Sequence, residues 1–512
     1  MSRILFVLLI AAIAAPASAQ VPATAPSTAQ AATLQLSMDQ AVAMALETNL
    51  GLKADRLGID IASENVAGAR AAFRPQLHTS FTQNTSDQVP SNFTDANVSV
   101  VTSGSSSISS TFGQSLAWYG GSYSVTWSGN RSTTNANFSP FNPRLGSSLG
   151  LSFTQPLFRN LLIDSNRYGV QAAERTRQIA DLTLEQRIAT TRNAVQQAYL
   201  SLIAAIEGFK VAQQNMDLAQ ETLKNFRLRV AVGVSADIEV IQAEAQVASN
   251  EEQVVVAEAS IATAEDALRA LMVDPARADY WQIHLQPSDT IAAAPHPIDV
   301  DAAIRNALAS RLDLIAARRQ QDITSLGLRL DENLTRPDVS FNLGYTAQGT
   351  GGTQFNFGSG FPPPIVSRTD RAFPSVLGDA FTNAYPSWTA SVNVAYPLGL
   401  TAAKASLARD RLAKQQQDLG VRDLELQVAA AVRNAARDVQ TNYKRVEATQ
   451  KARQATERQL DAEQRKFGVG LSTSFELQTR QSELAQARVG ELNAMIDYNR
   501  SLIAFERVQK IQ

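Results

Sequence analysis

The sequence predicts a mainly α-helical protein that also contains a membrane β-barrel, and three observations lead to this prediction. The chain is duplicated, because LSMDQAVAMALETNLGL at 36–52 and IDVDAAIRNALASRLDL at 298–314 lie 262 positions apart and have similar sequences. Apolar residues recur at every seventh position over long stretches, which indicates coiled coils. Short segments between those stretches alternate apolar with polar or small residues, as barrel strands do.

The duplication continues along the chain. The same offset superposes Arg74-Pro75 on Arg336-Pro337. Further on the two copies drift by short insertions and deletions, but TQPL at 154–157 still matches AYPL at 395–398, and VGVSADIEVI from Val232 matches VGLSTSFELQ from Val469. Each half therefore consists of a helix, strands, a long helix, a turn and a helix. The expected transitions between helix and strand are marked by prolines, which end regular helices, at Pro75, Pro156, Pro337 and Pro397.

The first residues predict export. Residues 1–19 contain Arg3, an apolar run at 4–13 and the small residues Ala17-Ser18-Ala19, a pattern typical of a cleaved signal peptide. The apolar run is shorter than the roughly 20 residues that a membrane-spanning helix needs. Residues 20–35 are rich in Ala, Pro, Thr and Ser, which predicts a flexible leader. The chain has no Cys, so we expect no lipidated cysteine, disulfide or thiolate chemistry.

Charge and hydropathy exclude two further classes. The 46 Lys and Arg nearly balance the 48 Asp and Glu, so no overall basic field favours nucleic acid. Beyond the signal, the sequence has no uncharged apolar stretch of about 18 residues, which excludes a multispan helical transporter. Entry into a membrane would therefore require β-strands.

The helices of the first copy are expected at 36–75 and 158–272. SMDQ from Ser37 is a capping box that begins the first helix. In the second segment the sevenfold spacing predicts a coiled-coil hairpin that turns at Gly233. The long arm of that hairpin carries the apolar series Ile188, Val195, Leu202, Phe209, Met216, Leu223 and Val230.

The second copy repeats the pattern with a helix at 301–335 and a hairpin at 399–512, in which Arg453 and Glu491 interrupt the apolar seam. Polar seam residues either set the register of a coiled coil or face water. A helix of roughly 70 residues is about 105 Å long, too long for a compact domain. The shorter helices, at 236–272 and 301–333, should stack end to end beside a long one, with the linker 273–300 bulging at the equator.

Strands are expected in 76–157 and 336–398. Each group of strands must leave the side of the membrane where the helices lie and return to it, so the number of membrane crossings in each half is even. We assign 77–84 and 149–155 to the first half and 339–347 and 388–397 to the second, and leave 123–130 in a long loop. A soluble sandwich would show the same alternation, but isolated strand groups between very long helices favour a membrane.

These assignments give about four strands per chain, whereas the smallest transmembrane barrels have about eight. The barrel must then be shared between chains. A homotrimer with a 12-stranded barrel and twelve helical columns is the simplest closed symmetric solution that leaves a lumen.

The duplication, QPLF at 155–158 and the paired turns VGVS and VGLS make the chain resemble the TolC-like outer-membrane efflux protein family. The resemblance implies a trimer with a β-barrel pore in the outer membrane and a periplasmic α-barrel tunnel. It also implies a passive exit duct of a tripartite efflux pump or a type I secretion system, exporting small molecules or proteins. The implied partners are a periplasmic adaptor (membrane fusion) protein and an inner-membrane pump, either ABC-type or proton-driven.

The resemblance also implies roles for the hairpin tips. Adaptor contacts carry over to Val232, Gly233, Val234, Ser235, Val469, Gly470, Leu471 and Ser472. The two glycines would in any case be required where a turn needs positive φ.

A second implied site is a ring of acids facing the lumen at the periplasmic aperture, which carries over to Glu476 and to Glu239 in the first copy. Three carboxylates would form a negative field that binds multivalent cations. A solvated helix carboxylate is the alternative. Where relatives can have a second acid, this chain has Thr479. Where relatives close the entrance with a Tyr before the tip and a basic residue after it, this chain has Phe467 and Ser472.

Enzymatic chemistry is not expected. GSSLG at 146–150 matches a serine-hydrolase elbow, but it leads from a Ser/Asn-rich loop into a strand and not from strand to helix. The chain has no phosphate loop, and three His without Cys or a His-x-x-x-His pair predict no metal site and no cofactor. The remaining rival is a trimeric coiled-coil adhesin stalk without transport activity, although parallel stalks would not need antiparallel hairpins.

Overall fold

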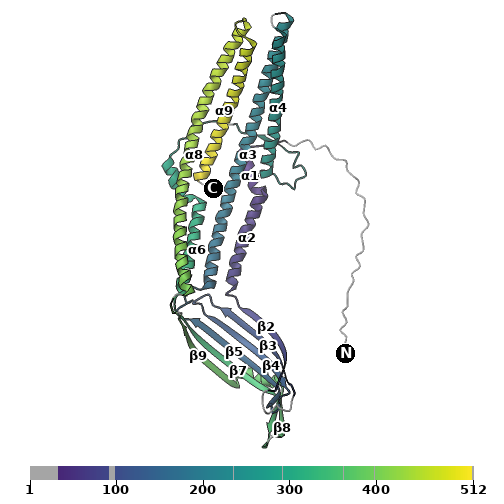
Figure 1. The fold of residues 1–512 in the computed structure, drawn as a ribbon, viewed down its shortest axis with the longest axis vertical. Coiled ribbons are helices and arrows are strands. Elements are labelled where there is room, and N and C mark those ends of the chain that lie inside the picture. The colour runs from purple at the N-terminus through teal and green to yellow at the C-terminus, as the bar shows by residue number, and fades with distance from the viewer. Residues whose placement is uncertain are drawn as a thin grey trace, which may run out of the picture.

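The structure is a computed structural model of the 512-residue chain. Long helices form one end of an elongated molecule and a β-sheet forms the other (Figure 1). The predicted signal peptide and leader residues 20–32 lie outside the described residues. The structure describes residues 33–90, 99–233, 236–290, 292–360, 363–396, 398–399 and 401–509.

Two antiparallel helical hairpins confirm the predicted coiled coils. The long helices are α3 (Ser165–Ala231) and α8 (Ala402–Gly468), with 67 residues each, and α4 (Asp237–Met272) and α9 (Ser474–Gln509) return beside them with 36 each. At 1.5 Å per residue each long helix is about 100 Å long. The seam residues Val195, Leu202, Val432 and Val439 are all buried.

The remaining helices are broken at equivalent places in the two copies. The single helix expected at 36–75 is instead α1 (Met38–Thr48) and α2 (Leu50–Ala71), and its counterpart is α5 (Val300–Ser310) and α6 (Leu312–Leu334). The breaks fall at Asn49 and Arg311, again 262 positions apart.

Asn49 explains the first break. Its side-chain oxygen accepts a hydrogen bond from the backbone N–H of Leu52 and so caps α2, while its Nδ2 donates to the Leu271 carbonyl, 3.1 Å away, at the end of α4. The chain therefore bends where α4 stops, and α2 continues the line of α4 beside α3 (Figure 1). In the second copy Ser310 Oγ lies 3.5 Å from the Gln509 carbonyl, where α9 ends beside α6. The helix lengths predict end-to-end stacking of 236–272 on 301–333, and this pairing is wrong. Stacking occurs within each copy instead, because α4 meets α2 and α9 meets α6.

A small two-stranded sheet lies at the equator. The strand β1 (Thr33–Leu36) pairs in parallel with β6 (His284–Pro287), so Thr33, Leu34 and Gln35 are not part of a flexible leader. The Tyr199 hydroxyl donates towards the Leu36 carbonyl (3.0 Å) and the Asp289 carboxylate (2.9 Å). Burial, with Asp289 beside it, raises the pKa of Tyr199 to about 12, so this hydroxyl remains a neutral donor.

The two polar residues of the second seam pair with each other. Arg453 on α8 forms an ion pair with Glu491 on α9, and a second one with Glu457, 2.9 Å away on its own helix. The side chains of Arg453 and Glu491 are largely covered by the hairpin. The pair therefore fixes how α8 and α9 align, which is the register role that the sequence left as one of two possibilities.

We expect Glu491→Ala to lower the thermal unfolding midpoint, at a cost of about 2 kcal/mol, because it removes the only ion-pair partner of the covered Arg453 on the facing helix and leaves it paired with Glu457 alone. The double variant Arg453→Leu/Glu491→Leu should recover most of that loss, since an apolar pair continues the seam. Thermal melts followed by circular dichroism test both. A double variant as unstable as Glu491→Ala would contradict the pairing role.

The sheet is antiparallel and contains more strands than the four expected. Its order is β2-β3-β4-β5-β7, with β8 and β9 both paired to β7. The strands are β2 (Gln76–Gln88), β3 (Val101–Ser115), β4 (Ser122–Thr134), β5 (Phe141–Pro156), β7 (Asp338–Phe357), β8 (Ile365–Arg371) and β9 (Tyr385–Ala395).

Most of the difference lies in the first half, although β8 in the second half was not expected either. Residues 123–130, expected in a loop, belong to β4, and β3 was not expected at all. β3 consists almost entirely of Ser, Thr and Gly, with Ile108 and Phe112 as the only large apolar residues after Val101. So few apolar positions leave almost no alternation to detect.

A short helix, α7 (Phe373–Phe381), lies between β8 and β9 in sequence and packs on β5 and β7. Pro75 lies between α2 and β2, Pro156 is the last residue of β5, Pro337 directly precedes β7, and Pro397 is outside the described residues. Within the described ranges, none of the helices has both the length and the apolar character needed to cross a membrane.

Candidate functional site

The two hairpin tips have the same turn geometry. Both long helices end one residue before a valine, Val232 or Val469, which is followed by a glycine with φ of +79°. The backbone N–H of Gly233 donates to the Val230 carbonyl (2.9 Å), and that of Gly470 donates to the Phe467 carbonyl (3.1 Å). Val234 and Ser235 lie outside the described residues. Glycine is required here because a Cβ is unfavourable at positive φ.

Apolar side chains project into solvent around these turns. Val232 is 73% exposed, Val469 72% and Leu471 79%. We call the following six exposed residues the tip patch: Val232, Ile238, Ile241, Val469, Leu471 and Phe475. Large apolar side chains that are exposed together at the tips commonly mark a protein interaction site.

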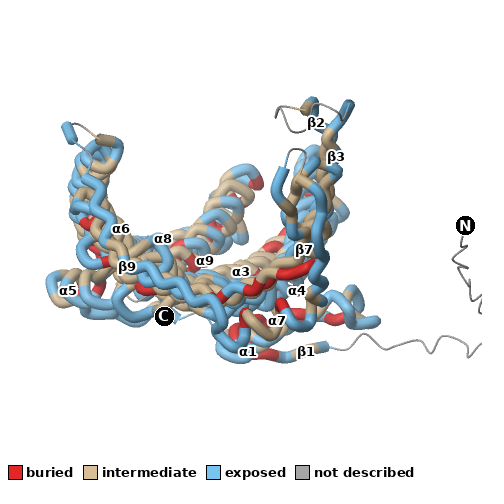
Figure 2. The backbone as a smooth tube through the Cα atoms, turned by 90° about the horizontal axis from the view of Figure 1, so that it is seen from below, coloured by how far each residue is buried: buried red, intermediate tan, exposed pale blue. Residues whose placement is uncertain are grey.

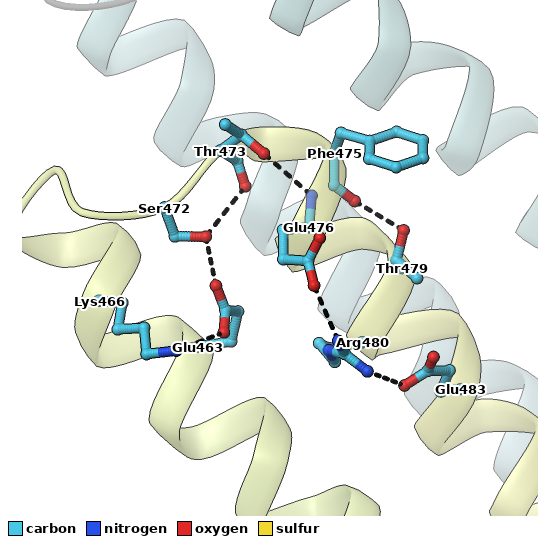
Figure 3. A network of polar contacts seen from close by, with 9 residues as sticks. All are labelled: Glu463, Lys466, Ser472, Thr473, Phe475, Glu476, Thr479, Arg480 and Glu483. Carbon is cyan, nitrogen blue, oxygen red and sulfur yellow. Dashed lines mark hydrogen bonds and ion pairs between the residues drawn. The ribbon is translucent and has the colours of Figure 1, made fainter.

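Glu476 lies in the first turn of α9, beside this patch. Its backbone N–H donates to Thr473 Oγ1, 3.3 Å away, and its carboxylate pairs with Arg480, 2.8 Å away, which also binds Glu483 (Figure 3). The carboxylate is therefore partly neutralised within its own helix. Glu239 occupies the equivalent place in α4, but Ala243 stands where Arg480 stands in α9.

A buried carboxylate stabilises the second tip, and the sequence reasoning missed it. Glu463 accepts a hydrogen bond from the Ser472 hydroxyl and lies 3.4 Å from Lys466 Nζ (Figure 3). The hydroxyl donor, supported by Lys466, lowers the pKa of Glu463 below its usual value. Ser472 thus holds the turn, whereas the family resemblance implied an adaptor contact at a position where relatives have a basic residue. The available signal was that Glu463 occupies the seam position of Phe226 in the first copy.

The lowered pKa of Glu463 gives a pH prediction. A carboxyl whose folded pKa is depressed stabilises the fold above its unfolded pKa of about 4.3, and the contribution is lost as pH falls through the folded pKa. Ser472→Ala should therefore lower the thermal midpoint at pH 7, and the difference from the unchanged protein should shrink below pH 4. Thr479→Ala, which removes a hydroxyl bonded to the Phe475 carbonyl, is the control and should show a difference independent of pH. A pH-independent effect of Ser472→Ala would refute the linkage.

The two hairpins contact each other near their tips through an aromatic cluster. Phe226 on α3 meets Phe467 on α8 edge to face, with ring centroids 5.5 Å apart, and the Arg229 guanidinium lies 4.3 Å from the Phe467 centroid. Arg229 also reaches the Phe467 carbonyl, at 3.4 Å. A groove of about 450 Å³ lies between the hairpins at this level. Further from the tips, Gln481 on α9 donates to Thr222 on α3, 3.0 Å away.

At the opposite end of the molecule, the sheet has one apolar and one polar face. Cross-strand pairing places apolar residues opposite one another on a single face. This apolar face comprises Leu77, Phe81, Ile108, Phe112, Tyr123, Val125, Trp127, Leu149, Leu151, Phe153, Phe341, Leu343, Tyr345, Trp388 and Val392.

The other, polar face consists mainly of hydroxyl side chains. Many of them hydrogen-bond across strands, such as Ser124 with Ser152 and Ser128 with Ser148, each 2.7 Å apart. The polar face includes Ser80, Thr82, Ser107, Ser109, Thr111, Thr126, Ser128, Ser148, Ser152, Thr346, Ser387 and Thr389.

The curvature of the molecule assigns these faces to the inside and the outside. Sheet and helices form one open arc when viewed along the long axis, and α7 lies on its convex side (Figure 2). A Cβ on Gly349 or Gly351 would collide with Val376 of α7, so α7 packs over these two glycines. Both glycines belong to the apolar face. The apolar face is therefore convex and the polar face concave. A membrane barrel that encloses water requires this orientation.

Comparison with known proteins agrees with this architecture. A family model described as "Outer membrane efflux protein" matches residues 120–272 and 303–508. The curated proteins contain no match. The fold is similar to that of the CmeC outer membrane channel of Campylobacter jejuni (13% identity, TM-score 0.65), with 93% of this chain and 85% of that chain covered.

Two further solved structures are similar. The outer membrane protein VceC of Vibrio cholerae is 15% identical, with a TM-score of 0.64 and coverage of 93% of this chain and 97% of that one. For the MtrE outer membrane channel of Neisseria gonorrhoeae the identity is 16%, the TM-score 0.62 and the coverage 95% and 93%. Identities this low show the fold alone.

Long helical hairpins joined to a curved, two-faced sheet define the class of outer-membrane channels with a helical tunnel and a β-barrel domain. The chain belongs to the outer membrane efflux protein family. It is an outer-membrane efflux channel, from a family of channel proteins and not of enzymes.

Proposed function

We propose that three copies of this chain assemble into a channel-tunnel that crosses the bacterial outer membrane and extends into the periplasm. The observation that carries the proposal is the open arc with an apolar convex face and a hydroxyl-rich concave face. One chain leaves this arc unclosed, because among the described strands β2 pairs only with β3 and β9 only with β7. Symmetric copies would bring the free edges together and enclose a lumen.

In this proposal the channel is the passive exit duct of a tripartite efflux pump or a type I secretion system. An inner-membrane pump supplies the energy, and a periplasmic adaptor joins it to the tip patch and the two tip turns. The chain is exported by a cleaved signal peptide and is not lipidated. The support for adaptor docking is the apolar, exposed character of both tips, where a partner helix would bury surface that now faces water.

Purified protein from outer-membrane fractions tests the assembly. We expect a trimer that dissociates on heating in detergent and that conducts ions in planar bilayers. A monomer, or a trimer without conductance, would contradict the proposal.

The acidic residue Glu476 gives a second test. If its three copies face the aperture, Glu476→Ala should weaken the block of ion current by multivalent cations, by roughly threefold to tenfold. Arg480→Ala should strengthen the block, because it frees the Glu476 and Glu483 carboxylates from their ion pairs. Titration of single-channel current with a trivalent cation measures both. Equal block in all three proteins would remove Glu476 from the aperture.

A further inference from the structure

The sheet contains a strand pair that the duplicated plan of the chain does not require. In the second half the chain runs once along the sheet away from the helices, as β7, and once back, as β8 and β9. In the first half it runs along the sheet four times, as β2, β3, β4 and β5. β8 and β9 pair with successive parts of the same edge of β7, so they form one return column interrupted by α7. Each chain therefore contributes six columns of strand.

The extra hairpin β3–β4 spans the sheet from end to end. β2 pairs with β3 over its entire length, from Gln76 opposite Gly113 to Gln88 opposite Val101. β4 is paired in the same way on the other side, from Ser122 opposite Thr154 to Ser132 opposite Arg144. The hairpin is thus an integral part of the sheet, with a hydrogen-bonded neighbour on both sides.

Its turn is fixed at the helical end of the sheet. The Leu116 N–H donates to the Gly121 carbonyl (2.7 Å), and Gln155 Nε2 donates to the Tyr119 carbonyl (2.7 Å). Gly120, with φ of +67°, approaches so closely that a Cβ would lie 2.3 Å from the Asn160 carbonyl oxygen. Gln114 Nε2 also donates to the Phe73 carbonyl, 2.9 Å away, just after α2. The chain therefore returns to the helices between β3 and β4.

The side chains of the hairpin follow the faces of the other strands. Ile108, Phe112, Val125 and Trp127 continue the convex apolar face without a break from β2 to β5. On the concave face Thr111 and Thr126 hydrogen-bond at 3.0 Å. A loop folded against the outside or inside of a barrel would have no reason to maintain both faces in register, because a shift of one residue exchanges them.

The width of six strands also matches the width of the helical part. Four helical columns at 8–10 Å spacing cover about 32–40 Å of circumference per chain. Six strands spaced by about 4.8 Å and tilted by about 40° cover about 38 Å, whereas four would cover about 25 Å. A six-column sheet therefore continues the wall of the tunnel without narrowing.

From these observations we propose that the trimer closes an 18-stranded barrel, in which β2 of one chain pairs antiparallel with β9 of the next. This inference rests on the proposed trimeric channel and specifies its membrane wall. The partner is a second copy, because β2 runs away from the helices and β9 runs towards them, as closure requires. Compared with twelve strands, eighteen increase the cross-section of the barrel by about 2.3-fold, since diameter grows roughly linearly with strand number.

Cysteine crosslinking tests the closing edge, and the chain has no native Cys to interfere. In trimers, Ser80→Cys on β2 is combined with Ser387→Cys, Thr389→Cys or Ser391→Cys on the concave face of β9. At least one combination should give disulfide-linked chains, because paired residues point to the same face. The matched controls combine Ser80→Cys with Trp388→Cys or Val392→Cys, which face outward and should not crosslink. Absence of crosslinks in the first set, or equal crosslinking in both sets, would overturn the pairing.

Single cysteines test whether β3 and β4 line the barrel. In reconstituted trimers, a charged thiol reagent should modify Ser107→Cys and Ser128→Cys roughly tenfold or more faster than Ile108→Cys and Val125→Cys, since charge is excluded from lipid. A lipid-soluble reagent should reach the second pair. Loss of this alternation in a trimer that still conducts would overturn the 18-stranded wall alone. A trimer that does not conduct before any substitution would instead overturn the proposed channel.

Discussion

Loosening the contact between the two hairpins should open the channel. We expect the variant Arg229→Ala/Phe467→Ala to show higher single-channel conductance or a larger open fraction than the unchanged protein. Phe467 contributes an aromatic pair with Phe226 and a cation–π contact with Arg229, and these two contacts join α3 to α8 at the tip. Together they are worth about 1–3 kcal/mol, so their loss shifts a closed-to-open equilibrium by roughly 5-fold to 150-fold per chain.

The control for this experiment is Arg227→Ala. Arg227 lies two residues from Arg229 and carries the same charge, but its partner is Glu244, 2.7 Å away on α4 of the same hairpin. Its removal changes the charge of the tip without touching the link between hairpins. Conductance that is unchanged in the double variant, or raised as much by Arg227→Ala, would show that the aromatic cluster does not hold the tip closed. Planar-bilayer recording at low multivalent-cation concentration measures all three proteins.

The sequence left this contact unassigned for a physical reason. The family resemblance placed Phe467 where relatives have a tyrosine, but the partner of Phe467 is about 240 residues away and belongs to the other hairpin. Spacing within a helix predicts which residues face the neighbouring arm of the same hairpin. It carries no information about how two separate hairpins lean on each other.

Features that depend on local periodicity were predictable. The capping box at Ser37 is formed as expected, and seam residues such as Val195, Leu202, Val432 and Val439 are buried in the two hairpins. The glycine turns were also readable, because Gly233 and Gly470 sit where two apolar series stop and resume. In each case the residues that decide the structure lie within one or two helical turns of one another.

Features that depend on tertiary contacts were not predictable. The break at Asn49 arises because its side chain bonds to Leu271, far along the chain, whereas the local sequence favours a continuous helix. β3 forms because β2 and β4 flank it, although its own Ser-rich sequence alternates weakly. The Ser472–Glu463 bond likewise joins a turn residue to a residue of α8 that the sequence did not single out.

Bulky residues at the tip glycines should abolish export while leaving the trimer intact. We expect Gly233→Leu and Gly470→Leu each to raise the intracellular accumulation of exported dyes to the level of cells lacking the protein. The structure makes this expectation specific, because an added Cβ at either glycine meets no atom within 4 Å in the chain itself. A larger side chain there would therefore extend away from the chain, into the space that the proposed adaptor would approach.

Backbone strain must be separated from this effect, since both glycines have φ of +79°. Gly470→Ala introduces the same unfavourable φ, at about 1–2 kcal/mol, but adds only one methyl group. It should therefore export almost normally if adaptor approach is what matters. Gly420→Leu, in an open position on the surface of α8, controls for an added apolar side chain away from the tip. Gel analysis without heating verifies that trimers persist in every variant.

The pattern across the four variants decides between turn geometry and docking. If Gly470→Ala loses export as completely as Gly470→Leu, the turn conformation itself is required and side-chain bulk is irrelevant. If both leucine variants export normally, a partner does not approach these glycines at all. Loss confined to Gly233→Leu and Gly470→Leu is the expected result, because the two turns have the same geometry and the proposed trimer would present three of each to the proposed adaptor.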